Sequence, residues 1–397
     1  MEREKLIEMD NLINAFIEEY SSNITEKNAA KAINSFKEEW KVFDNYAGNN
    51  SYGKSLIILS SAYYFSPSTN VNDLKNLTRL IEDYDNNPGT QYKFPIKHSL
   101  YFNLGMCWHK LGSEFYSNAV EAFKKYVYYL LKLSSNTSYS NFTAYSFKRC
   151  DKYLFQSLIN DELNLSSPSK FNDPFDCPIR VLLQNDEEIS SLLRYTYDSC
   201  LKVACFIRNK KLPYMKEDVY INDEYKINDD KEEFLKSVMW SHYADSHKGI
   251  CIKYKFTHSI PQIDDRNITV FSYLKDVRYS DDDMSKYSEH DSINMHDAFF
   301  LKGQQWEYEN ELRYIYFDIN GKNGFQQIKI PNTIEAIYFG LACSVTDINT
   351  IINIMKNKKL IVKDHEGNVT EEKPIKFYKI KMDLTQFGNL IAEEIQI

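Results

Sequence analysis

The spacing of the apolar residues changes near residue 150, and this change constrains the fold more than any other feature. Before it, apolar residues recur at helical spacing; after it, short runs rich in β-branched and aromatic residues alternate with helical stretches. Such a mixture favours the α+β class. A chain of 397 residues is also long enough for two cores. We therefore predict a helical domain over residues 1–148 and a mixed α+β domain over residues 149–397.

The N-terminal segment divides into helical hairpins separated by turn signals. The first two hairpins are expected over residues 4–46 and 51–84. The third carries an aromatic residue, Leu-Gly, a second aromatic residue and then Ala-x-x-x-Phe, a pattern that runs from Tyr101 to Phe123. This pattern resembles a tetratricopeptide repeat, and a generic helical bundle is the alternative. In either case we expect this half to supply a surface that binds a protein or peptide partner, or a lid, rather than chemistry.

The second half combines short strands with helices. Val, Ile, Tyr and Phe dominate the runs that we interpret as strands, and turn residues separate them. The expected strands cover residues 249–256, 269–271, 306–317, 327–330, 334–339 and 375–380, and the expected helices cover residues 187–200, 229–244 and 345–356.

Residues 306–314 carry acids at every second position. Because side chains alternate between the faces of a strand, Glu307, Glu309, Glu311 and Arg313 would share one face, with aromatic residues on the other. Like charges at this spacing repel, so they need water, a cationic partner or a function. Two interpretations stay open here, a set of catalytic carboxylates or a Glu–Arg network that fixes the register of the strand.

Composition and charge argue against several classes of protein. A formal net charge of -8 disfavours broad, nonspecific affinity for nucleic acid. The seven cysteines form no CxxC pair and no zinc-type spacing, so we expect reduced thiols and a cytoplasmic protein. The N-terminus lacks the pattern of a secretory signal, and no apolar run approaches the ~20 residues of a membrane span. We expect no membrane partner.

No metal is predicted. His242 and His247 stand five residues apart, whereas a helical zinc pair needs a spacing of four. For His242 we expect a hydrogen bond within the core or a contact with a phosphate. The sequence contains no P-loop, no Rossmann glycine fingerprint and no Gly-x-Ser-x-Gly elbow.

Four islands of the second half carry a family resemblance. They lie at residues 153–176, 203–206, 239–252 and 306–314, and they include Phe-Asn-Asp-Pro-Phe-Asp and Met-Trp-Ser-His-Tyr-Ala. In this order they resemble the bacterial family catalogued as domain of unknown function 2971, over about residues 150–345. Members are often found beside phage-defence genes, which implies a defence or toxin-like effector whose helical half binds a phage-derived trigger.

The first island offers a candidate ring-binding ledge. Asn172 and Asp173 precede a proline, a combination that favours a turn and needs no further explanation. Together with Phe171, the same residues would also form a surface on which a planar ring stacks while amide groups meet its edge. Both interpretations stay open.

The order of the islands also resembles the ADP-ribosyltransferase superfamily, whose sheet is split. This resemblance implies that Phe155, Gln156 and Ser157 form an early strand against NAD, and that Tyr243 is the middle residue near the nicotinamide.

The same resemblance makes Glu309 and Glu311 the late acidic pair. Glu311 would stabilise the oxocarbenium ion that forms when the nicotinamide bond breaks, and Glu309 would act on the acceptor. Arg313 would bind the pyrophosphate or pair with Glu311.

Three functions follow as hypotheses. The first is an effector that uses NAD as substrate and transfers ADP-ribose to a macromolecule, whose identity the sequence does not give, or hydrolyses NAD. The second is a non-enzymatic protein-binding module in a bacterial defence system. The third is a metal-dependent nuclease, which only scattered acids support.

Overall fold

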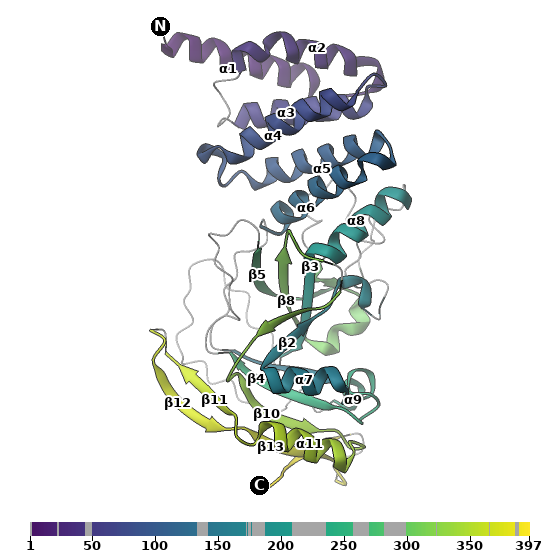
Figure 1. Cartoon of the computed structure of the whole chain (residues 1–397), viewed down its shortest axis with the longest axis vertical. Helices are drawn as coiled ribbons and strands as arrows, with labels where there is room; N and C mark the ends of the chain where they lie inside the picture. Colours follow the sequence, from purple (N-terminus) through teal and green to yellow (C-terminus); the bar gives the residue numbers. More distant parts are fainter. Residues whose placement is uncertain are drawn as a thin grey trace.

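The computed structural model describes residues 2–21, 24–43, 50–132, 142–171, 173, 176, 187–208, 236–256, 270–281, 299–322, 324–364, 366–385 and 389–397. Its described part is a stack of helices followed by a domain built on a mixed β-sheet, with the two chain ends at opposite ends of the molecule (Figure 1). The predicted α+β class is therefore confirmed.

Six helices form the N-terminal half as three successive hairpins, as the turn signals predict. Asn70 begins α4 with a capping box, in which its side chain accepts from the backbone of Asp73 while the Asp73 side chain accepts from the backbone of Asn70. The helices are α1 (Glu2–Tyr20), α2 (Glu26–Phe43), α3 (Asn50–Phe65), α4 (Val71–Asn86), α5 (Phe94–Lys110) and α6 (Tyr116–Lys132), and the short 3-10 helices η1 (Pro88–Thr90) and η2 (Ser113–Phe115) lie between them.

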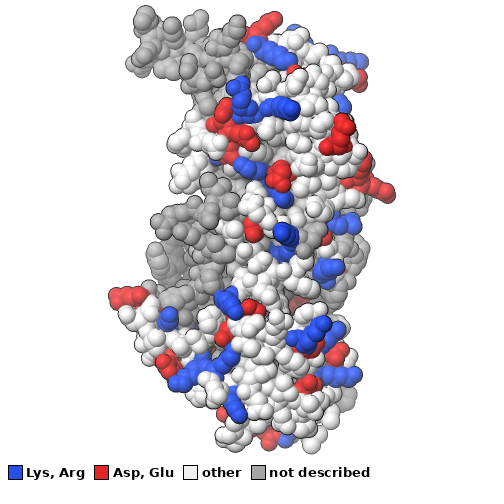
Figure 2. Space-filling model, viewed as in Figure 1, with Lys and Arg blue, Asp and Glu red and all other residues white. Residues whose placement is uncertain are grey.

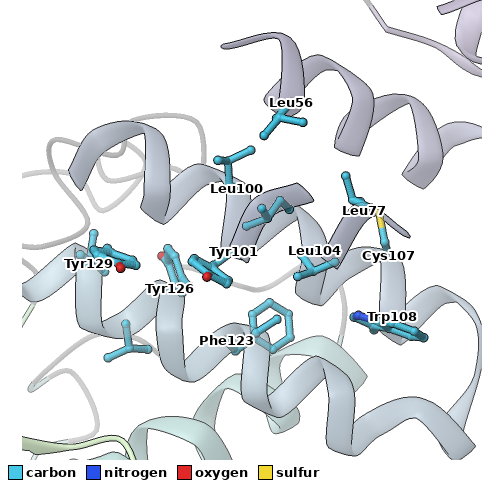
Figure 3. Close-up of a cluster of buried hydrophobic side chains, with 14 of the residues drawn as sticks. Leu56, Leu77, Leu100, Tyr101, Leu104, Cys107, Trp108, Phe123, Tyr126 and Tyr129 are labelled. Carbon is cyan, nitrogen blue, oxygen red and sulfur yellow. The ribbon is translucent and has the colours of Figure 1, made fainter. Parts of the chain in front are cut away.

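Close packing of α5 on α6 explains the glycine of the third hairpin. A Cβ atom at Gly105 would lie 2.5 Å from the ring of Phe123, so only glycine lets the two helices approach this closely. Leu104 and Trp108 line the same core, which Figure 3 shows between the helices. The residues of the repeat-like pattern are therefore the residues that pack the hairpin together.

The second half is organised around one eight-stranded sheet. The order of its strands is β14-β13-β10-β4-β1-β3-β8-β5, and every neighbouring pair is antiparallel except β10 and β13. The strands are β1 (Phe142–Lys148), β3 (Leu201–Ile207), β4 (Ile250–Phe256), β5 (Val270–Asp276), β8 (Glu311–Asp318), β10 (Ile334–Phe339), β13 (Lys376–Met382) and β14 (Leu390–Glu394).

Helices and short ribbons surround this sheet. Helix α7 is followed by β2, which pairs with β9, while β6 pairs with β7 and β11 with β12. These elements are α7 (Lys152–Asn160), α8 (Glu187–Cys200), α9 (Ser237–Tyr243), α11 (Val345–Met355), β2 (Glu162–Leu165), β6 (Arg278–Tyr279), β7 (Leu301–Lys302), β9 (Gln326–Lys329), β11 (Lys359–Lys363), β12 (Val369–Pro374), and the 3-10 helices η3 (Pro168–Lys170) and η8 (Gln304–Glu309).

The large sheet has a weak seam between β1 and β3. Tyr145 and Ile207 form the single paired position that joins these two strands in the described part of the chain. Nearer the start of β3, Val203 pairs instead with Ser166, and the two backbones form hydrogen bonds of 2.9 and 2.8 Å. The segment that follows β2 therefore pairs with the part of β3 that does not pair with β1.

One hydrophobic core joins the two halves of the molecule. It includes residues of α3 to α6 together with Val203 of β3 and Phe317 of β8. The rings of Tyr128 and Phe317 lie 5.8 Å apart, and α8 packs on α6 (Figure 1). The helical stack is therefore packed directly on one end of the sheet.

Two predicted elements of the second half are wrong. Residues 304–309 form the 3-10 helix η8, and the strand begins only at Glu311, so Glu307, Glu309 and Glu311 do not share one strand face. Phe155, Gln156 and Ser157 lie in α7, because Asp151 caps this helix by accepting from the backbone of Tyr153 and Leu154. The strand that precedes this helix is β1, which we did not predict. Of the helix expected over 229–244, residues 229–235 lie outside the described part.

The helices of the described part include none that is long and apolar enough to cross a membrane. On the face that Figure 2 shows, basic and acidic side chains are interspersed.

Packing at Gly105 leads to a test of the hairpin. Alanine favours helices over glycine, but its Cβ would enter the ring of Phe123, so Gly105→Ala should lower the free energy of unfolding by about 1–3 kcal/mol. Denaturant unfolding of this variant and of a Phe123→Leu, Gly105→Ala double variant checks the cause. The loss of unfolding free energy caused by Gly105→Ala should be smaller when Phe123 is also changed to leucine, measured against Phe123→Leu alone. An equal loss with phenylalanine and with leucine at this position would contradict the packing described here.

Candidate functional site

Five charged side chains are buried together on one face of the sheet. They come from four segments of the chain, and their exposure is 0% for Arg313, 3% for Glu309, and 4% for Glu311 and Lys302. Asp176, the fifth, is also buried. We call this group the charge cluster; it comprises Asp176, Lys302, Glu309, Glu311 and Arg313. Three carboxylates thus face two cations in the interior.

Arg313 is the centre of the cluster. Its guanidinium holds Glu311 with two bonds, of 2.7 Å from Nε and 3.1 Å from Nη2. Nη2 also donates to Asp176 at 2.6 Å, and Nη1 donates to the carbonyl of Phe299 at 2.7 Å. The ring of Phe171 lies 5.4 Å from the guanidinium carbon. These partners occupy the donors of a group that cannot lose its charge in the interior.

Lys302 joins the remaining carboxylates. Its Nζ atom lies 2.5 Å from Glu309, 3.3 Å from Glu311 and 3.5 Å from Asp176. The same ammonium lies 4.9 Å from the ring centre of Trp306. Although burial opposes it, the three carboxylates raise the pKa of Lys302, so the lysine stays charged.

A left-handed residue brings the two glutamates to one lysine. In a strand Glu309 and Glu311 would project in parallel, but Asn310 between them has φ 46° and ends η8. Asparagine tolerates this conformation, and the Asn310 side chain donates a hydrogen bond of 2.6 Å to the carbonyl of Arg208. The turn lets both carboxylates reach Lys302 from consecutive elements.

The two glutamates have opposite electrostatic environments. Burial tends to raise the pKa of Glu311, but Arg313 and Lys302 outweigh it and lower the pKa to about 2. For Glu309, burial together with the charge of Glu311 outweighs Lys302 and raises the pKa above its ordinary value of 4.5. Glu311 is therefore a fixed anion, and Glu309 is the carboxylate that takes up a proton more readily.

Aromatic side chains lie beside Glu309 and Lys302. The hydroxyl of Tyr243, at the end of α9, donates to Glu309. Tyr308 and exposed His242 are linked by a 3.2 Å contact between the hydroxyl and Nδ1. The ring of Trp306 lies 6.0 Å from each of these two rings. We call His242, Tyr243, Trp306 and Tyr308 the aromatic rim.

Two residues at the end of the first island, Phe171 and Asp176, lie against Arg313. The predicted turn is present, since the backbone N–H of Asp176 donates to the carbonyl of buried Asp173 at 3.1 Å. This turn carries Asp176 to Arg313, and Phe171 lies against the same guanidinium. Asn172, the third predicted member of the ledge, lies outside the described residues.

Helix α7 does not reach the cluster. Phe155 of this helix packs in a core with Leu312 and Tyr314, which lie on the face of β8 opposite Glu311 and Arg313.

The other two predicted residues of α7 are either exposed or bonded to residues close to them in the sequence. Gln156 is exposed, while the Ser157 hydroxyl accepts from Asn164 at 2.6 Å and donates to the backbone. The structure thus brings Tyr243, Glu309, Glu311 and Arg313 together and separates Phe155, Gln156 and Ser157 from them.

Two members of the cluster were not predicted. Lys302 lies in a strand of two residues, too short to leave a periodic signal, so its burial has no signature in the sequence. Asp176 is the last residue of the Phe-Asn-Asp-Pro-Phe-Asp motif, which did point to this segment. No group of three or more residues that could hold a metal ion occurs among the residues that the structure describes.

The fold and the site define an α+β protein in which a helical stack covers one end of a sheet that buries a charged network. Residues 239–314 match the model of a family described as a protein of unknown function, DUF2971. The resemblance predicted from the sequence is confirmed over this stretch, which contains Tyr243, Lys302, Glu309, Glu311 and Arg313. Comparisons with curated proteins and with solved structures found no match.

The environment of Glu311 predicts a specific dependence of stability on pH. Its pKa is lower in the folded protein, about 2, than its ordinary value of 4.5, so ionisation of Glu311 stabilises the fold. This contribution is on the order of 3 kcal/mol, is present above pH 4.5, and is lost as the pH falls from about 4.5 to about 2.

Unfolding of the wild type and of Glu311→Gln across this range measures the effect. The difference between the two proteins should be largest at neutral pH and shrink in acid, while Glu371→Gln, an exposed carboxylate of β12, serves as the control. A difference that does not change with pH would contradict the assignment.

Proposed function

We propose that this protein cleaves the bond between nicotinamide and ribose in NAD, with Glu309 as the reacting carboxylate. The arrangement that carries the proposal is a pair of nearby buried glutamates that share Lys302 while Arg313 holds Glu311, so that their pKa values shift in opposite directions. Sites that perform acid–base chemistry push the pKa values of neighbouring carboxyl groups apart in this way. The resemblance to ADP-ribosyltransferases supplies NAD as the substrate class.

Burial of the charge cluster supports a functional role. Removing five charged groups from water costs free energy that their mutual attraction offsets only in part, so a buried network is weak evidence for stability alone. Here the network is also unbalanced, with three carboxylates and two cations. Burial, together with the negative charge of Glu311, raises the pKa of Glu309 and favours proton exchange at this carboxyl group.

The roles of the two glutamates differ from those that the sequence suggested. Glu311 accepts two bonds from Arg313 and a third from Lys302, so its charge is already paired with two buried cations. Glu309 is one hydrogen bond away from the half-exposed Tyr243 and lies below the aromatic rim. We therefore assign the reacting role to Glu309, and to Glu311 and Arg313 the role of holding it in place.

In the proposed reaction the glycosidic bond breaks and its electron pair leaves with nicotinamide. The ribose becomes an oxocarbenium ion, which the negative charge of Glu309 stabilises. Water or a hydroxyl, amine or carboxyl group of an acceptor then adds to the ribose carbon, and Glu309 takes the proton that the nucleophile loses. The aromatic rim offers ring faces on which the nicotinamide or adenine stacks.

Nicotinamide release by the full chain tests this proposal. We expect Glu309→Gln to lower the rate by about 10²-fold or more, because glutamine keeps the shape but cannot exchange a proton. Tyr243→Phe should retain part of the activity, and the control Glu371→Gln should retain all of it. The assay is run with and without a cell extract as a source of acceptors.

Thermal melts accompany the assay to show that each variant is folded. Full activity in folded Glu309→Gln, or no nicotinamide release by the wild type with or without extract, would refute the proposal.

A non-enzymatic binding module is the second candidate, and the burial of Glu311 against Arg313 favours it. In that case the cluster fixes the sheet, the helical stack binds a protein, and Glu309→Gln leaves partner binding unchanged. Capture of the same partners by the wild type and Glu309→Gln, without NAD turnover in either, would support it. Three further points stay predictions: a cytoplasmic location, a role in phage defence and a metal-dependent nuclease activity.

A further inference from the structure

Two cysteines that are distant in the sequence meet at one end of the sheet. Strand β4 lies between β1 and β10, and Lys148 and Phe339, near the ends of those strands, both pair with Ile250. Cys150 and Cys343 follow these strands by a few residues. The two thiols interact through a side-chain hydrogen bond, and both cysteines are free and lie in the same hydrophobic core.

Each of the two cysteines directly precedes the cap of a helix. Asp151 caps α7, next to Cys150, and Ser344 caps α11, next to Cys343. Helices α7 and α11 contact each other, and because the two thiols that precede them interact, their positive N-terminal ends are close together. The N-terminal end of a helix favours the thiolate form of a nearby cysteine.

A lysine adds to this positive environment. Nζ of Lys379 donates to the carbonyl oxygens of Gly340, at 2.6 Å, and of Cys343, at 3.4 Å. The hydrogen bond between the two thiols, with the charge of Lys379, outweighs burial and the charge of Asp347 and lowers the pKa of the Cys343 thiol. The same hydrogen bond and burial raise the pKa of Cys150. The pair thus has one thiol prepared for attack and one beside it.

Other described cysteines lack this arrangement. Cys107 and Cys200 donate to backbone carbonyls inside helical cores, and Cys251 is buried within β4. Cys205 interacts with Glu311, whose negative charge disfavours a thiolate. Cys150 is partly accessible, so a small oxidant reaches the pair from its side.

We propose that Cys150 and Cys343 form a reversible disulfide that joins the N-terminal ends of α7 and α11 when the protein meets a peroxide. The Cys343 thiolate attacks one peroxide oxygen, the O–O bond breaks, and the leaving oxygen takes a proton to form water or an alcohol. Cys150 then attacks the resulting sulfenic sulfur, an S–S bond forms, and a second water leaves. Two thiols are oxidised, one peroxide is reduced, and a dithiol reverses the reaction by exchange.

Treatment of the full chain with hydrogen peroxide tests the proposal. Thiol titration should show the loss of two free thiols, and the intact mass should fall by about 2 Da, the mass of two hydrogen atoms. Peptide mapping without reductant should find the peptide of Cys150 linked to that of Cys343. The melting temperature should rise because the bridge closes a long loop, and dithiothreitol should reverse all four changes.

Cys150→Ser and Cys343→Ser should each abolish the linkage, whereas Cys205→Ala, which removes an exposed thiol, should leave it intact. The mapping of the wild type decides the question even where a variant does not fold. Oxidation of Cys150 or Cys343 to separate acids, linkage of either to another cysteine, or no loss of thiols would overturn the proposal. The outcome does not depend on whether the protein cleaves NAD.

Discussion

The buried guanidinium of Arg313 is the constraint on which the second half of the structure depends. Arginine stays charged at any pH that the fold survives, so its complete burial is tolerated only if its donors meet acceptors. Glu311 of the same strand, Asp176 of the preceding motif and the carbonyl of Phe299 meet this need. One side chain thereby ties three segments of the chain to the centre of the sheet.

This arrangement gives the two glutamates different partners and therefore different roles. Arg313 holds Glu311, whereas Lys302 and Tyr243 hold Glu309 within the described part of the chain. The same strand that carries Glu311 and Arg313 continues to Ile315 and Phe317, which pack in the core shared with the helical stack. The start of β8 therefore supplies residues of the charge cluster, and its end supplies residues of the core that joins the two halves.

Much of the fold was predictable because it rests on local patterns. The helical hairpins follow from apolar spacing and turn residues, and β4 and β10 follow from runs of β-branched and aromatic residues. The strand over residues 306–310 failed because alternating acids fit both a strand and a helical turn, and nothing in the pattern shows that Asn310 adopts the left-handed conformation.

The site was predictable only in part, since its members meet through long-range contacts. Tyr243, Glu309, Glu311 and Arg313 were found because their motifs are unusual in sequence. Lys302 was not, because its burial depends on three carboxylates from other segments. The placement of Phe155 in a strand ignored the capping residue Asp151, which was a usable signal for a helix.

The titration of the two glutamates tests the central claim most directly. Carbon NMR of the side-chain carboxyl groups, with Glu309→Gln and Glu311→Gln used to assign the signals, reports each protonation step in the folded protein. The structure predicts that Glu311 titrates near pH 2 and that Glu309 titrates above its ordinary value of 4.5. Titration of both carboxyl groups near that ordinary value would contradict the division of roles between them.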